Sequence, residues 1–197
     1  MALVVLDRQH TGKPHNMKDT GAYSRVVEKH EAHMVAQYLL EAEITLRELG
    51  HVVMPISAGR YSDRHRSANA VFKHYNGPCI YMSGHLNAGG GSYGALFFDE
   101  RSTMGKQASA FIATELQGLL GEAPVKCLGA TPDDWTKNAY NTISGVWSGK
   151  GCGICLEPFF LDDAQAKELM SPEGLLEVGV AIAHGVDGWA KELAADS

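Results

Sequence analysis

The sequence predicts an α/β fold, specifically a three-layer αβα sandwich in which a mostly parallel central sheet lies between helices. Two observations predict this fold class. Short apolar runs alternate along the chain with longer stretches that carry apolar residues at helical spacing. No internal repeat or low-complexity linker interrupts the 197 residues. We therefore expect one domain over residues 1–197, built around a single core.

The elements follow from these patterns in chain order. Continuous apolar runs predict strands at residues 2–6, 52–56, 79–83, 93–98, 125–128 and 153–160. Helical periodicity predicts helices at residues 28–49, 62–75, 104–120 and 175–193. Gly50 is a plausible residue to end the first helix, and Asn76-Gly77-Pro78 ends the second. The sequence predicts one long irregular segment at residues 129–150. A segment of this length is either functional or contains a helix or strand that the residue pattern does not reveal.

Composition excludes several classes of protein. The formal charge of −6 and the pI near 5.8 indicate no basic surface for nucleic acid or an anionic membrane. No apolar run is long enough to insert stably in a bilayer, and the N-terminus lacks the basic start of a signal peptide, so we expect synthesis in the cytoplasm. Cys152 and Cys155 have CxxC spacing, but they lead into an apolar run, which favours a buried strand over a metal or redox site.

Polar residues at or near the ends of predicted strands are the candidates for chemistry. His10 follows the first strand, His85 follows the third, and Glu157 lies among apolar residues of the last strand. Glu31 lies near the start of the first helix. In open α/β sheets, functional residues collect beyond the carboxyl ends of the strands. Each residue alone has an ordinary structural explanation, so the hypothesis depends on their joint occurrence.

His10, Glu31 and His85 together match a common ligand set for one catalytic Zn²⁺ ion. Two histidines and one carboxylate leave a coordination position open for water, whose pKa the ion lowers while it polarises a carbonyl. A further carboxylate is needed to move the proton of that water to the leaving nitrogen. Glu157 is the candidate for this base.

Four blocks of the sequence, in order, resemble the zinc-dependent N-acetylmuramoyl-L-alanine amidases known as the type 3 peptidoglycan amidase family. These blocks are Leu6-Asp7-Arg8-Gln9-His10, Glu31 ahead of Leu49-Gly50, Ser83-Gly84-His85-Leu86-Asn87-Ala88, and Leu156-Glu157-Pro158-Phe159-Phe160-Leu161. Arg66 and the pair Ala68-Asn69 also resemble family positions before the third strand.

The resemblance implies that the protein hydrolyses the amide bond between N-acetylmuramic acid and L-alanine in peptidoglycan. It implies Zn²⁺ on His10, Glu31 and His85, and catalysis by Glu157. Residues 1–197 would then form a single catalytic amidase domain with no separate wall-binding module. The lack of such a module and of a signal peptide suits a bacteriolytic phage endolysin that reaches the cell wall after a holin-type partner permeabilises the membrane, and a prophage or cytoplasmic bacterial enzyme is the alternative. Asn87 is a candidate for substrate contact.

Some positions depart from the family pattern or stay ambiguous. Gln9 stands where the family has glycine, and Gly84 replaces an apolar residue, which predicts a looser strand end. Glu28 and His30 lie close to Glu31 and are rival ligands.

Two further features are expected near the metal. The loop from Gly89 to Ser92 lacks the Lys-Ser/Thr of a phosphate loop, so we expect a flexible rim beside the site. Aromatic side chains could line a groove for glycan and peptide, although core packing is an alternative for each. These are Tyr93, Trp135, Tyr140 and Trp147.

Two other functions fit the same residues. A zinc amidohydrolase of small N-acyl amino acids would use the same metal set but would need a closed basic pocket. A non-catalytic cell-wall-binding module would carry a degenerate site, against which the retention of His10, Glu31, His85 and Glu157 argues.

Overall fold

The computed structural model describes residues 1–10, 19–134, 140–146 and 151–195. Its strands are β1 (Leu3–Arg8), β2 (Tyr23–Ser24), β3 (Lys29–His30), β4 (Val52–Ile56), β5 (Cys79–Gly84), β6 (Gly94–Asp99), β7 (Val125–Ala130) and β8 (Gly151–Glu157). Its helices are α1 (Glu31–Glu48), α2 (Tyr61–Phe72), α3 (Thr103–Leu120), α4 (Tyr140–Ile143) and α5 (Pro172–Ala195), with 3₁₀ turns η1 (Pro132–Asp134) and η2 (Ala164–Lys167).

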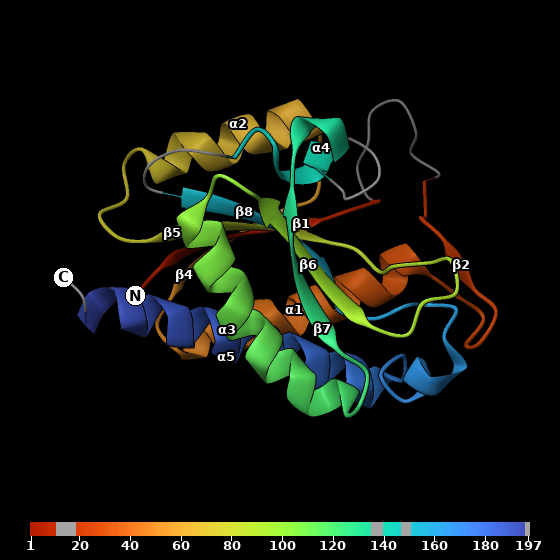
Figure 1. The fold of residues 1–197 in the computed structure, drawn as a ribbon. Coiled ribbons are helices and arrows are strands. Elements are labelled where there is room, and N and C mark those ends of the chain that lie inside the picture. The colour runs from red at the N-terminus through yellow and green to blue at the C-terminus, as the bar shows by residue number, and fades with distance from the viewer. Residues whose placement is uncertain (11–18, 135–139, 147–150, 196–197) are drawn as a thin grey trace.

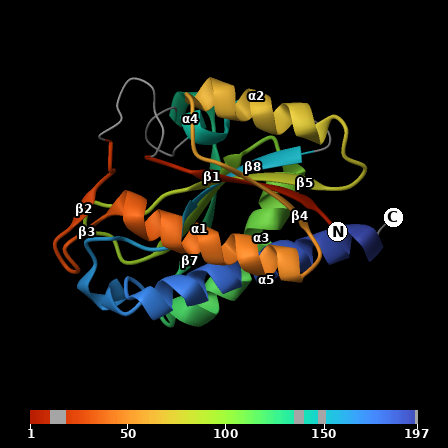
Figure 2. The same cartoon turned by 180° about the vertical axis from the view of Figure 1, so that it is seen from behind.

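The central sheet confirms the predicted α/β class. Its strand order is β4-β1-β5-β8-β6-β7, and every neighbouring pair is parallel except β6 with β8. Helices α2 and α4 cover one face, and α1, α3 and α5 cover the other (Figure 1). The same three layers are visible from behind (Figure 2). A mostly parallel sheet needs both faces covered, which explains why its strands are nearly continuous apolar runs.

The carboxyl ends of β1, β5 and β8 meet at one edge of the sheet. These three strands are parallel neighbours, and β6 runs in the opposite direction beside β8, so Ala95 at the start of β6 pairs with Glu157. We call this the catalytic edge, defined by Arg8, Gly84 and Glu157 as the last residues of β1, β5 and β8.

The boundary of the first helix differs from the prediction in an informative way. Helix α1 begins at Glu31 rather than at residue 28, because Lys29 and His30 pair with Ser24 and Tyr23 in a short antiparallel ladder. Glu28 takes a left-handed backbone conformation, with φ of 56°, which stops the helix from starting earlier. Gly50 ends the segment with φ of 86°, the conformation that glycine adopts most easily.

Other elements were missed or misplaced. The segment 129–150, expected to be irregular, contains η1 and α4 within its described part. The last strand stops at Glu157 rather than at residue 160, since Pro158 follows and cannot donate to a ladder. The interpretation of Cys152 and Cys155 is confirmed, because both are free and buried within β8.

No helix in the described part of the chain is both long enough and apolar enough to cross a membrane.

Gly84, at the end of β5, is tightly packed rather than loose. A β-carbon built there would lie 2.6 Å from Leu39 Cδ1, 2.9 Å from Tyr38 Oη and 2.9 Å from Val35 Cγ1, all on α1. The hydroxyl of Tyr38 also donates to the carbonyl of His85 at 3.1 Å. Glycine at position 84 therefore allows α1 to approach the strand that carries His85.

Gly84→Ala should lower the free energy of unfolding by about 1–3 kcal/mol, because the added methyl group overpacks this contact. The matched control is Gly118→Ala on α3, where the new methyl group meets no atom within 4 Å. The free energy of unfolding of that control should rise by up to about 1 kcal/mol, because alanine lowers the conformational entropy of the unfolded chain. Urea unfolding measures both, and an unchanged midpoint for Gly84→Ala would contradict the packing argument.

Candidate active site

The structure brings His10, Glu31 and His85 together at the catalytic edge. Glu31 Oε1 lies 3.0 Å from His10 Nε2 and 3.2 Å from His85 Nδ1, and the two nitrogens are 3.3 Å apart. His10 lies in the turn two residues after β1, Glu31 in the first turn of α1, and His85 directly after β5. Among the described residues, these three form the group of side chains that could hold a metal ion. Two imidazole nitrogens and one carboxylate oxygen fit the donor preferences of Zn²⁺.

Glu28 and His30, the rival ligands, lie outside this group. Glu28 is exposed on the turn before β3. His30 Nδ1 lies 3.1 Å from Thr20 Oγ1, on the short β2–β3 ladder.

Both oxygens of Glu31 are held by the chain itself. The backbone N–H of Leu86 donates to Oε1 at 3.0 Å, and that of Ala22 donates to Oε2 at 3.0 Å. Gly21, with φ of 69°, passes so close that a β-carbon there would lie 2.5 Å from Oε2. Burial opposes ionisation of Glu31, but hydrogen bonds with His10 and His85 hold its pKa well below the ordinary value. The carboxylate is therefore ionised and fixed in place.

Asp19 is a functional candidate that sequence reasoning missed. Its Oδ1 lies 3.0 Å from His10 Nδ1 and accepts the Gly21 N–H at 3.0 Å. Burial lowers the pKa of His10, yet hydrogen bonds with Glu31 and Asp19 outweigh it and raise the pKa above its ordinary value. A carboxylate on the far nitrogen of a ligand histidine orients the ring and selects its tautomer. No motif marks Asp19; only the rule that ligand histidines have such a partner could have prompted a search for it.

Glu157 ends β8 beside this cluster and has a different electrostatic environment. Burial and the charge of Glu31 raise its pKa to about 7, opposed by a hydrogen bond from the Asn87 side chain. A carboxyl group that titrates near neutrality is suited to accept and return a proton. Asn87 is itself fixed by its backbone, which donates to the Phe159 carbonyl at 3.1 Å and accepts the Leu161 N–H at 2.9 Å.

A buried ion-pair network supports the strand that carries His10. Arg64 on α2 pairs with Asp7, which also accepts hydrogen bonds from the hydroxyl of Tyr81 and the amide of Gln9. The guanidinium of Arg64 reaches the Arg8 carbonyl at 3.3 Å as well. Gln9, where the resembled family has glycine, thus joins this network just before His10, whose backbone is left-handed with φ of 60°.

Arg64, rather than Arg66, is the buried arginine of α2. Arg66 is exposed, and its ion-pair partner among the described residues is Asp63 at 3.3 Å, on the surface of its own helix. The sequence pattern had drawn attention to Arg66 instead.

The glycine-rich loop from Gly89 to Ser92 is anchored, in contrast to the flexible rim expected. The backbone N–H groups of Gly89 and Gly90 both donate to Asp162 Oδ2, at 2.9 and 3.0 Å. Gly91 lies against the ring of Phe160, where a β-carbon would be 2.3 Å from Cζ. Position 91 therefore has no room for a side chain, whereas Gly89 and Gly90 lie in open space and have positive φ angles of 121° and 81°.

The expected aromatic wall is only partly observed. Tyr93 packs against Phe160, with ring centroids 4.7 Å apart. Tyr140 is buried, and its hydroxyl donates to Asp99 at 3.1 Å, at the end of β6 away from Glu157. Trp135 and Trp147 lie outside the described residues.

The fold and the cluster define a class, namely α/β proteins with an open His/Glu/His site at the carboxyl ends of parallel strands. Comparison with solved structures then identifies the fold as that of the N-acetylmuramoyl-L-alanine amidases.

Three solved structures illustrate the similarity. Cwp6 from Clostridium difficile is 20% identical, with a TM-score of 0.73, and the match covers 94% of this chain but 29% of that one. The catalytic domain of the amidase CwlV from Bacillus (Paenibacillus) polymyxa var. colistinus is 16% identical, with a TM-score of 0.68, and each chain is fully covered. The catalytic domain of the CD27L endolysin, which targets Clostridia difficile, is 18% identical with a TM-score of 0.58, covering 94% of this chain and 96% of that one.

Searches of the sequence against protein-family models and against curated proteins found no match.

Arg64→Met should lower the free energy of unfolding by about 3–5 kcal/mol, because it leaves the buried Asp7 without its counter-charge. Arg66→Met, on the exposed face of the same helix, should change stability by no more than about 0.5 kcal/mol. Urea unfolding of both variants checks this. Equal effects at the two positions would contradict the assignment of Arg64 as the supporting arginine.

Glu157→Gln should stabilise the metal-free protein in a pH-dependent way. Unfolded, Glu157 ionises near its ordinary pKa of 4.5, whereas in the folded protein it stays protonated up to about pH 7. Wild-type stability therefore falls as pH rises from 4.5 to 7, and the glutamine variant escapes this loss. The stability difference should grow over that interval and level off above it.

Unfolding in the presence of a chelator, at several pH values, measures this difference. Glu192→Gln, at an exposed position of α5, is the matched control and should show none. A difference for Glu157→Gln that does not vary with pH would contradict the raised pKa.

Proposed function

We propose that this protein is a zinc-dependent amidase that hydrolyses the bond between N-acetylmuramic acid and L-alanine in peptidoglycan. The observation that carries the proposal is the meeting of His10, Glu31 and His85 within hydrogen-bond distance, with Glu157 beside them, at the catalytic edge. The amidase fold of the solved neighbours supports the choice of substrate.

The donor set fits Zn²⁺ on its chemistry and on its surroundings. One nitrogen from each histidine and one oxygen from Glu31 lie within 4.8 Å of one another, so a single ion can reach all three. Asp19 supplies the carboxylate partner that a ligand histidine usually has. When bound, zinc acidifies a water molecule and polarises the carbonyl to be attacked.

The chain's own groups then carry out the proton transfers. Glu157 accepts a proton from the attacking water and donates it to the amide nitrogen, which leaves as the free amine of the L-alanine residue at the start of the stem peptide. Burial, the main cause of its raised pKa in the metal-free protein, favours the protonated form that Glu157 takes between the two transfers. Asn87 steers the carboxylate through its hydrogen bond, and its position after His85 makes it a candidate for contact with the substrate. Asp19 and Glu31 keep the His10 ring in orientation.

We further propose that residues 1–197 act as one catalytic domain on the cell wall, in the manner of an endolysin. The full mutual coverage with the CwlV catalytic domain and the similarity to an endolysin catalytic domain support this setting. For a phage enzyme, release by a membrane-permeabilising partner is the route we propose to the wall.

The zinc-loaded protein, incubated with purified peptidoglycan, should release free stem peptides whose N-terminus is L-alanine. N-terminal labelling and mass spectrometry of the soluble products measure this. Release of sugars without peptides, or no release from several peptidoglycan types, would overturn the amidase proposal. Hydrolysis of N-acyl amino acids in place of peptidoglycan would instead support the rival amidohydrolase.

Two variants separate the metal from the base. Glu157→Gln should keep one bound zinc but lose about 10²–10⁴-fold in turnover, since it removes the proton carrier. His85→Ala should weaken zinc binding, which a competing chelator measures. If Glu157→Gln retains full activity, the assignment of the base is wrong even if the zinc site stands.

A further inference from the structure

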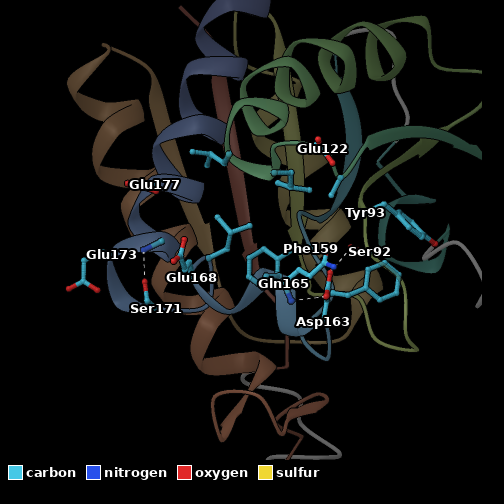
Figure 3. Close-up of a pocket in the computed structure, with 17 residues that line it drawn as sticks. Ser92, Tyr93, Glu122, Phe159, Asp163, Gln165, Glu168, Ser171, Glu173 and Glu177 are labelled. Atoms are coloured by element: carbon cyan, nitrogen blue, oxygen red, sulfur yellow. Dashed lines mark hydrogen bonds between the residues drawn. The ribbon is translucent and has the colours of Figure 1, made fainter.

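A cavity of about 480 Å³ lies between the end of α3, the segment after β8 and the start of α5 (Figure 3). Its apolar wall includes Leu119, Leu120, Phe159, Phe160 and Leu169. The volume falls within the range of pockets that hold small ligands. The site described above does not use this cavity, since none of the proposed metal ligands lines it.

The charged residues that line this cavity are all acidic. Glu122, Asp163, Glu168, Glu173 and Glu177 line it, and no lysine, arginine or histidine does. Asp163 is engaged by Ser92 Oγ at 2.7 Å and by the Gln165 N–H at 2.9 Å. The four glutamates form no ion pair with the residues that the structure describes. In the view of Figure 3, Glu122 lies on one side of the apolar side chains and Glu168 on the other.

The chain itself supplies one ammonium group beside the cavity. The Nζ atom of Lys126 lies 3.6 Å from the centroid of the Tyr93 ring, and Tyr93 lines the cavity. This contact is a cation–π interaction. The Tyr93 ring is therefore already occupied, and it is the apolar wall and the unpaired carboxylates that complement one chemistry, an aliphatic chain that ends in an ammonium group.

The cavity borders the catalytic edge. Ser92 and Tyr93 come just before β6, whose Ala95 pairs with Glu157, and Phe160 forms a bridge with Asn87. Phe160 is three positions after Glu157, so their Cα atoms lie within about 11 Å of each other. An extended peptide covers about 10 Å in three residues. A peptide whose first amide is at Glu157 can therefore place its third side chain at this cavity.

We propose that this cavity binds the lysine-type side chain of the peptide arm of the substrate, an aliphatic chain with a terminal ammonium group. The identity of the peptide rests on the proposed amidase function, whereas the preference for an ammonium group rests on the cavity alone. The site holds the peptide through apolar contacts with the partly exposed Leu119, Leu120 and Leu169 and through the surrounding glutamates. It thereby selects peptidoglycan whose stem carries a free amine.

The test measures binding without turnover. The probe is the stem peptide L-alanyl-γ-D-glutamyl-L-lysyl-D-alanine, which lacks the muramoyl amide and so cannot be cleaved at it. Its affinity for the zinc-loaded protein at low salt, measured by calorimetry or by NMR titration, is compared with that of the peptide acetylated on the lysine amine. We expect the free amine to bind about tenfold more tightly, and this preference to shrink as salt screens the exposed carboxylates.

Three substitutions around the cavity, Glu122→Gln, Glu168→Gln and Glu177→Gln, combined in one protein, should abolish the preference. Glu173 is left unchanged because it lies in the first turn of α5, where its charge favours the helix. Glu192→Gln, at an exposed position near the other end of α5, should keep the tenfold preference. A thermal unfolding curve for each variant establishes that it is folded.

Equal binding of the two peptides to wild type, or a preference that survives the triple substitution, would overturn the proposal. Peptidoglycan hydrolysis is measured separately on the same preparations. Hydrolysis without an amine preference in binding removes the cavity proposal and leaves the amidase. An amine preference without any hydrolysis removes the amidase and leaves a cavity that binds lysine-type side chains.

Discussion

The carboxylate of Glu31 holds the candidate site together. Its Oε1 atom lies within hydrogen-bond distance of His10, in the turn after β1, and of His85, and it accepts the backbone N–H of Leu86, both from the chain after β5. Its Oε2 atom accepts the backbone N–H of Ala22, just before β2. A buried anion is costly unless it is paired and hydrogen-bonded, so these segments cannot move apart without exposing or stranding the charge. The same charge that organises the histidines also acts on Glu157 and raises its pKa.

Two glutamates with the same intrinsic chemistry thus take different states at one edge of the sheet. Glu31 is ionised because histidines and backbone N–H groups surround it, whereas Glu157 has Asn87 as its hydrogen-bond partner and the charge of Glu31 nearby. This difference between their pKa values distinguishes the roles of the two residues. An ionised carboxylate suits a metal ligand, and a carboxyl group whose pKa is near 7 suits proton transfer. The roles follow from the environment rather than from the residue type.

Close packing beside the catalytic edge fixes the positions of the segments that carry the candidate site residues. Arg64 neutralises Asp7 in β1, three positions before His10. Gly84 lets α1, which carries Glu31, pack against the end of β5, directly before His85. Asp162 fixes the glycine-rich loop that follows Asn87. Each support acts on a residue next to the site, so a change in it can alter the site without touching a ligand.

The sequence by itself determined the fold class and the approximate place of His10, His85 and Glu157. Apolar runs in a parallel sheet are buried on both faces, so they mark strands clearly, and a polar residue just after such a run stands at the strand's carboxyl end. The start of α1 at Glu31 was predicted only within a few residues, since it depends on the β2–β3 pairing and on the left-handed backbone at Glu28. Asp19, Arg64 and the acidic cavity were decided by the tertiary structure. Asp19 is defined by its contact with His10, Arg64 by its contact with Asp7 across 57 residues, and the cavity by three segments that meet only when α3 and α5 pack together. Local pattern records burial and periodicity, but a partner distant in sequence leaves no periodic signal, and so only the folded chain reveals it.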